Sequence, residues 1–318
     1  MSPASPSDLS ARSLRGIAIL LMAGAIFPVL DAGGKVLITN HGMSGAEVAL
    51  VRLVQQALWM VPFLLWRRGV GGFRTPQLGL NLLRGALLGV GGILFFAALG
   101  FMPLADAVAI FMIAPMLQVL LAVPILKEPI GWKRILAILI GLVGALVIVR
   151  PSYAIFGLAS LLPLATAFLV SLYIILSRFA SRGTDPLAMM FHAGTGGAVT
   201  VAVIMVLAMP FDIGILAFSW PSEGRAFWLV LGVGVVGTLA HLLTLEAYAR
   251  APAAVLAPFN YAELIFAIIA GYLFFGDLPD RIRWIGMVIV IVSGLVLYWL
   301  ERRSHRRRQV PAPVPNAL

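Results

Sequence analysis

The side chains of this sequence that could do chemistry are ionisable groups set inside long apolar stretches. Glu263, Arg52, Asp31 and His241 each interrupt a stretch composed mainly of aliphatic residues, glycine and phenylalanine. An ionisable group in hydrocarbon costs roughly 2.5–3.5 kcal/mol on insertion scales, so such groups are rare and usually functional. A carboxyl group there can bind a proton or a cation, which makes Glu263 the leading candidate for ion coupling.

These four groups are expected at similar depths in their helices. At a rise of about 1.5 Å per residue, Glu263 lies near the middle of its stretch and Arg52 about 4–5 Å from the middle of its own. Asp31 and His241 lie about 6–7 Å from the centres of theirs. One interpretation is a shared polar pocket; the other is a set of buried pairs that only hold the helices together.

Polar neighbours extend this set along the chain. Asn260 precedes Glu263 by three residues and shares its helix face, whereas Tyr261 lies about 160° around the helix from Glu263. The candidates for substrate binding are Asn260, Glu263, Tyr261, His241 and Arg52. The candidates for coupling or ion pairing are Glu263, Asp31 and Lys35.

Several charged residues also have a structural interpretation. Asp31 and Lys35 are four residues apart, so they can neutralise each other on one helix face or be released to a charged substrate. Glu246 and Arg250 have the same spacing where Arg250 can reach water, which favours a structural pair. Asp106 falls in the first turn of an expected helix, where a carboxylate suits the helix dipole and predicts a cap.

Motifs of soluble enzymes are absent or out of context. The chain has no cysteine, which excludes disulfides, Cys-ligated zinc, iron–sulfur clusters and thiol catalysis. Residues 232–237 match the dinucleotide fingerprint G-x-G-x-x-G, but within an apolar stretch close helix packing explains them better, as it does the G-x-x-x-G at 85–89. We expect no cofactor, no metal site and no catalytic residues.

The composition indicates that the chain is embedded in lipid. Hydrophobic residues make up 61% of the 318 residues and charged residues 11%, against about 45–50% and about 25% in soluble domains. A bilayer core needs roughly 20 apolar residues per helix. The expected fold is an all-α integral membrane protein with ten transmembrane helices, at 15–38, 44–65, 77–100, 104–126, 131–149, 153–177, 186–208, 225–249, 253–275 and 282–300.

The basic residues place both ends of the chain on one side of the membrane. With a cytoplasmic N-terminus, 16 Lys and Arg residues fall on the inner side, 4 fall on the outer side and 3 lie inside spans. Inner loops carry the excess of Lys and Arg, so the N-terminal segment 1–14 and the basic, Pro-rich tail 301–318 are expected in the cytoplasm. Because the net charge of +10 gathers in short loops between spans, it indicates contact with a lipid bilayer and not with nucleic acid.

A sparse internal repeat divides the chain into two units. Pro103 and Glu128 are 25 residues apart, as are Pro252 and Asp277. The repeats are expected at 15–149 and 150–300, with five spans each. An odd number of spans makes the two units cross the membrane in opposite directions, an arrangement found in secondary transporters.

The same stretches resemble the EamA-domain, ten-helix branch of the drug/metabolite transporter superfamily. The resemblance rests on residues 101–107, 250–254, 257–261 and 275–279 and on the turn Lys127-Glu128-Pro129. Asp31, Lys35 and Arg52 also resemble the pattern of a bacterial subgroup that includes riboflavin and S-adenosylmethionine uptake proteins. Two departures are Asp277, where the family usually has Glu, and Leu264, where the first repeat has a proline.

The resemblance implies a secondary transporter of the bacterial cytoplasmic (inner) membrane that moves a small organic metabolite by alternating access. Uptake of riboflavin-like or S-adenosylmethionine-like compounds and efflux of amino acids or toxic metabolites are both open. An integral-membrane lipid-modifying enzyme is the alternative from another class, but its usual charged surface motifs do not fit such short loops. No sequence feature indicates an oligomeric state.

Overall fold

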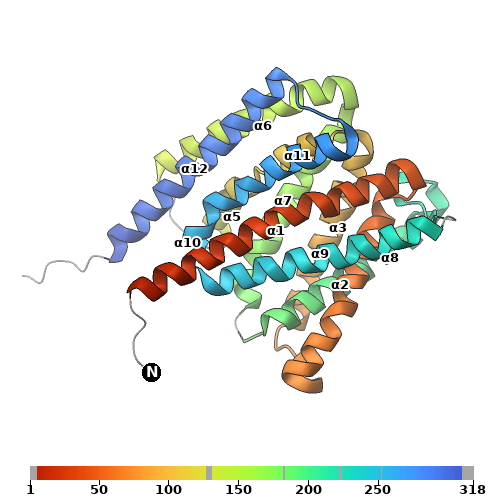
Figure 1. The fold of residues 1–318 in the computed structure, drawn as a ribbon, viewed down its shortest axis with the longest axis horizontal. Coiled ribbons are helices and arrows are strands. Elements are labelled where there is room, and N and C mark those ends of the chain that lie inside the picture. The colour runs from red at the N-terminus through yellow and green to blue at the C-terminus, as the bar shows by residue number, and fades with distance from the viewer. Residues whose placement is uncertain (1–5, 127–130, 182, 222–223, 252, 310–318) are drawn as a thin grey trace, which may run out of the picture.

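The computed structural model describes residues 6–126, 131–181, 183–221, 224–251 and 253–309. Within these ranges the chain is a bundle of α-helices and short 3-10 helices without a β-strand (Figure 1). Ten of the described helical segments are long and apolar enough to cross a membrane, which confirms the expected all-α, ten-span fold. The turn Lys127-Glu128-Pro129, Pro252 and the end of the tail from residue 310 lie outside the described residues.

The elements of the first five spans follow one another with short connections. They are α1 (Pro6–His41), α2 (Gly45–Arg68), η1 (Gly69–Phe73), α3 (Leu78–Phe101), α4 (Leu104–Phe111), α5 (Ala114–Leu126) and α6 (Trp132–Phe156). The second five spans are built from η2 (Gly157–Leu161), α7 (Leu162–Ala180), α8 (Pro186–Ala208), η3 (Met209–Phe211), η4 (Gly214–Leu216), α9 (Gly224–Arg250), α10 (Ala253–Leu256), η5 (Ala257–Tyr261), α11 (Ala262–Phe275) and α12 (Arg281–Gln309).

Three helices extend past the predicted ends of their spans. α1 begins at Pro6 and not at residue 15, so the described part of the predicted segment 1–14 is helical. α6 continues beyond residue 149 and ends at Phe156, where the next residue, Gly157, has a φ of 61°. α12 continues to Gln309, so the predicted tail 301–318 starts as a helix. Polar residues can extend these helices because propagation adds a backbone hydrogen bond per residue whatever the side chain's hydrophobicity.

The fourth and ninth spans are broken, although the sequence predicts continuous helices at 104–126 and 253–275. In the fourth span, α4 ends at Phe111 and α5 starts at Ala114, directly before Pro115. In the ninth span, a 3-10 helix that contains Pro258 separates α10 from α11. Proline lacks an N–H and clashes with the preceding turn, so it ends or kinks a helix. The fourth span of the first half and the corresponding span of the second half are therefore both discontinuous.

Helix packing follows a pattern that relates the two halves. α6 packs along α12 and α2 along α8, which pairs the fifth span with the tenth and the second with the seventh (Figure 1). α1, which is the first span, packs along α9, which is the eighth. A shift of five spans turns this contact into one between the sixth and third spans, and α7 does pack along α3. This pattern is consistent with the two predicted five-helix repeats, whose inverted sense stays a prediction.

Glycines bring α8 close to α3. A Cβ atom on Gly85 would lie 2.5 Å from the Ala193 carbonyl oxygen, and one on Gly89 would lie 2.8 Å from the Gly197 carbonyl oxygen. Without Cβ atoms at these positions the two backbones can pack directly against each other. The predicted packing role of the G-x-x-x-G at 85–89 is confirmed. Gly196 and Gly197 of the span at 186–208 belong to the same contact, whereas Gly194 packs against α2.

We expect Gly85→Ala to lower the free energy of unfolding by about 1–3 kcal/mol, because the new methyl group would overlap backbone atoms that cannot rotate away. Gly79→Ala on the same helix is the matched control, since its Cβ would meet no atom within 4 Å. It should leave the stability unchanged or raise it slightly, because alanine favours the helix. Thermal unfolding of both variants in detergent measures the difference, and equal transition temperatures would contradict the packing role.

Candidate functional site

The structure gathers the four mid-span ionisable groups in one region between α1, α2, α9 and α11. Asp31 of α1 and Arg52 of α2 interact electrostatically, and each is 7% exposed. Glu263 of α11 lies within electrostatic range of Asp31, and His241 of α9 lies within range of Arg52. These four residues were expected at a common depth, and the structure also places them close to one another. The interpretation as one polar region fits better than a set of separate pairs.

Small and aromatic residues shape this region. A Cβ atom on Gly24 of α1 would lie 3.7 Å from the Glu263 backbone nitrogen, so α1 approaches the start of α11 closely. The guanidinium group of Arg52 lies over the Phe96 ring, 5.9 Å from its centroid. Phe27 meets the His241 ring edge to face, with centroids 5.1 Å apart. Two aromatic rings thus border the charged groups.

His241 is oriented by its own helix. Its Nδ1 lies 2.9 Å from the carbonyl oxygen of Gly237, one turn earlier. A carbonyl oxygen can only accept, so Nδ1 carries the hydrogen and donates it. In the neutral ring, Nε2 then becomes an acceptor, which gives this side chain a defined polarity toward its surroundings.

Three of the charged groups are not satisfied by hydrogen bonds or close ion pairs in the described part of the chain. No hydrogen bond or ion pair there involves the side chain of Asp31, Arg52 or Glu263, and Arg52 Nε is buried without an acceptor. In hydrocarbon such an arrangement is costly unless the groups bind a proton, an ion or a polar solute. The guanidinium can donate to a solute, and the two carboxylates can accept from it.

The two remaining substrate-binding candidates, Asn260 and Tyr261, make their contacts with other residues. Asn260 of η5 donates through Nδ2 to the hydroxyl of Tyr248 on α9, at 3.3 Å. Tyr261 is 5% exposed, and its hydroxyl packs against α12 at Gly294. Tyr261 therefore lies away from the charged groups, in keeping with its predicted angle from Glu263.

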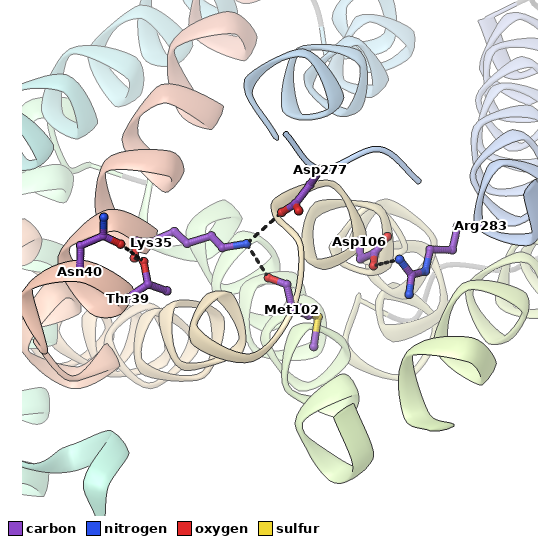
Figure 2. Close-up of polar contacts among 7 residues, drawn as sticks. All are labelled: Lys35, Thr39, Asn40, Met102, Asp106, Asp277 and Arg283. Carbon is purple, nitrogen blue, oxygen red and sulfur yellow. Dashed lines mark hydrogen bonds and ion pairs between the residues drawn. The ribbon is translucent and has the colours of Figure 1, made fainter. Parts of the chain in front are cut away.

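Lys35 does not pair with Asp31, so the expected pair of neighbours on α1 is not formed. Its Nζ lies 3.3 Å from Asp277 Oδ2 and donates to the Met102 carbonyl at 3.1 Å (Figure 2). The same ammonium group lies 4.6 Å from the centroid of the Phe275 ring. The long lysine side chain reaches toward the end of the bundle, while the short Asp31 side chain stays at the depth of Arg52.

Asp106 is an ion-pair partner, and the prediction that it caps α4 is wrong. α4 has no side-chain cap hydrogen bond. Asp106 Oδ2 lies 3.0 Å from an Arg283 nitrogen, and these side chains are 1% and 9% exposed (Figure 2). Arg283 also lies 3.5 Å from Asp280 Oδ2. Sequence reasoning missed Arg283 because its partner is 177 residues away, and only the packing of α12 near α4 brings them together.

Three further charged residues, Arg84, Glu246 and Arg250, serve the architecture. Arg84 of α3, another group that sequence reasoning missed, is 3% exposed and donates to Ser177 Oγ of α7 at 2.8 Å. Its guanidinium also lies 4.7 Å from the centroid of the Tyr173 ring, which ties α3 to α7, and it donates to Asn81 within α3. Glu246 and Arg250 form the expected pair on α9, where both are partly exposed.

A bundle of ten membrane-spanning helices, with broken spans and charged groups near the break, is typical of a membrane transporter. The EamA-like transporter family matches residues 14–150 and, a second time, residues 157–299. The chain belongs to this family.

Curated relatives match over nearly their whole length. The riboflavin transporter of Vibrio cholerae is 30% identical over 301 residues, which cover 93% of this chain and 97% of the relative. The S-adenosylmethionine uptake transporter of Rickettsia prowazekii is 29% identical over 292 residues, covering 92% and 95%. A solved crystal structure has a TM-score of 0.61 at 18% identity, covering 93% of this chain and 99% of that one, and this likeness shows the fold alone.

Family membership decides between the function classes that the sequence left open. The chain is a multi-pass membrane transporter of small molecules, and not the alternative lipid-modifying enzyme. The expected resemblance to the EamA family, and to riboflavin and S-adenosylmethionine uptake proteins within it, is confirmed.

We expect Asp106→Asn to lower the free energy of unfolding by about 3–5 kcal/mol, because it leaves the buried Arg283 guanidinium without its buried counter-ion. Asp280→Asn is the control. Asp280 is half exposed, so the same change should cost about 1 kcal/mol or less. Its Oδ1, which accepts the Arg283 backbone N–H at 2.8 Å, is kept in asparagine. Unfolding in a denaturant series measures both variants, and equal losses would show that burial of the pair does not matter.

Proposed function

We propose that this transporter imports a planar, polar metabolite of the riboflavin or S-adenosylmethionine type across the bacterial cytoplasmic membrane. The observation that carries the proposal is the set of charged groups without a hydrogen bond or ion pair, Asp31, Arg52 and Glu263, where α1 meets the broken ninth span. The name of the Vibrio relative supports a riboflavin-like substrate, and the name of the Rickettsia relative supports uptake of an S-adenosylmethionine-like one.

The chemistry of the region matches such a solute. Both compounds combine a planar nitrogen heterocycle with a flexible polar chain. The half-buried Phe27 offers an aromatic ring, and Arg52 offers donors to ring nitrogens or carbonyl oxygens. Asp31 and Glu263 can accept hydrogen bonds from hydroxyl or amino groups of the polar chain. His241 belongs to this region, and Asn260, three residues before Glu263, is the next contact in the proposal.

Glu263 is the proposed coupling group. It lies in the first turn of α11, directly after the 3-10 segment of the ninth span, and secondary transporters commonly build their sites at discontinuous helices. A carboxyl group that exchanges its proton or cation when substrate enters links the two fluxes. Asp31 lies within electrostatic range and is the second carboxyl group that this exchange affects.

The proposed mechanism is alternating access between the repeats at 15–149 and 150–300, with inverted orientation. The packing pattern that relates spans five places apart supports it, as does the separate match of the EamA-like family to each half. Both termini are proposed to lie in the cytoplasm, which the 16-to-4 distribution of basic residues supports.

Uptake of radiolabelled riboflavin and S-adenosylmethionine by proteoliposomes tests the proposal. We expect saturable uptake of one of the two compounds, and competition by unlabelled compound. Glu263→Gln should reduce gradient-driven uptake at least about tenfold, because the amide cannot bind and release a proton. Glu246→Gln, which alters an exposed carboxylate that is paired within α9, should keep normal uptake.

Two results would contradict this proposal. Normal gradient-driven uptake by a folded Glu263→Gln protein would remove Glu263 from coupling. Accumulation only in everted vesicles would show efflux instead of import.

Cysteine labelling in intact cells tests the orientation, because the chain has no native cysteine. Asn40→Cys, at the exposed end of α1, should react with a membrane-impermeant thiol reagent added outside. Pro76→Cys, in the exposed connection between η1 and α3, should react only after the cells are permeabilised. The reverse pattern would place the termini outside.

A further inference from the structure

A cluster of charged residues closes one end of the bundle, at a distance from the mid-span groups. It joins the connection between α3 and α4, the connection between α11 and α12, and the end of α1 (Figure 2). Its members from the first half are Lys35, Met102 and Asp106, and those from the second half are Asp277, Asp280 and Arg283.

Lys35 of α1 and Asp106 of α4 form ion pairs with the two sides of the segment after α11, one within the segment and the other in the first turn of α12. Lys35 holds this segment at Asp277, just after the last residue of α11. Arg283 fixes its other end, through Asp106 of α4 and through Asp280. The cluster therefore connects the ends of the two broken spans, since α4 begins directly after Met102 and its following proline.

The two pairs differ in the burial of their carboxylates. The side chains of Asp106 and Arg283 are 1% and 9% exposed, so water cannot replace the partner of either ion. Asp277 is 35% exposed and Lys35 11% exposed, so Asp277 can be hydrated when Lys35 leaves. The Asp106–Arg283 pair is thus suited to a permanent joint, and the Lys35–Asp277 pair to a contact that opens.

We propose that Lys35, the Met102 carbonyl, the Phe275 ring and Asp277 form a latch, which keeps this end of the transporter closed and opens when α1 moves away. The Asp106–Arg283 pair stays formed and acts as the joint. The inference rests on the proposed alternating access, because a carrier needs a reversible closure on each side of its site.

Opening the latch does not strand a charge in hydrocarbon. Asp31 lies four residues before Lys35 on α1, one helix turn away, and has no direct partner among the described contacts. A lysine that leaves Asp277 can therefore turn back toward Asp31. Lys35 would then exchange Asp277 for Asp31 as its carboxylate partner. Opening of the latch therefore changes the net charge of the mid-span region.

Thiol labelling of Met102→Cys tests the latch without any substrate. The Met102 side chain is 2% exposed beneath the latch, and the chain has no native cysteine. In detergent, a charged methanethiosulfonate reagent should label this cysteine about fivefold faster when Lys35→Met or Asp277→Asn is added. A partly exposed ion pair contributes up to about 1 kcal/mol, and its loss would shift the equilibrium between closed and open latch by about this factor. The double variant should label no faster than either single one, because both changes break the same contact.

Three controls separate opening from unfolding. Met60→Cys replaces a methionine that is 0% exposed on α2 and far from the latch in the sequence, so its slow labelling should not change in any of these backgrounds. Lys35→Arg keeps the charge and should label Met102→Cys nearly as slowly as the parent. Glu246→Gln removes a carboxylate from a pair within one helix and should have no effect.

Equal labelling of Met102→Cys in all backgrounds would overturn the latch, and so would independent, multiplying effects of the Lys35 and Asp277 changes. Faster labelling at Met60→Cys as well would assign these residues to stability instead. A protein that takes up neither compound can still show the expected labelling, so failure of the latch and failure of the proposed substrate are distinguishable.

Discussion

The lack of water in the bilayer core is the constraint on which the rest of this structure depends. An ionisable group there must be paired, reach the membrane surface or bind something during function. The chain uses each solution in a different place. Arg283 is paired with Asp106, Lys35 extends toward a connecting loop, and Glu263 and Arg52 keep no direct partner among the described contacts. The unpaired groups therefore identify the functional region more clearly than charge alone does.

The same constraint applies to the backbone at the breaks. A broken helix leaves carbonyl and N–H groups without their usual partners, and lipid cannot satisfy them. At the break of the fourth span, Ser171 Oγ of α7 donates to the Ala114 carbonyl at 2.9 Å. A side chain from the second half thus stabilises the discontinuity in the first half. A movement of one half relative to the other would alter this hydrogen bond and so act directly on the broken span.

The sequence predicted the helices and the depth of the charged residues, but it did not predict the partners. Span positions and the Gly85 contact follow from local composition and spacing, which one sequence contains. Lys35 and Asp277 are 242 residues apart, and only the packing of distant helices decides that they meet. The break at Pro115 was missed because a proline in a span is equally compatible with a kinked, continuous helix. The site residues were predicted because ionisable and polar side chains are rare in apolar helices. Tyr261 was among these candidates, but its packing on α12 separates it from the charged groups.

In the proposed cycle, α1 connects the mid-span region with the closed end. It carries Asp31 and Lys35 one turn apart, and it packs along α9 and α11, which bear His241 and Glu263. A helix moves as a rigid element, so a shift that loosens Lys35 also changes the distance between Asp31 and Arg52. Coulomb energies in a medium of low dielectric constant vary strongly with distance. A small movement of one helix is therefore sufficient to couple the two regions, and no continuous chain of contacts between them is required.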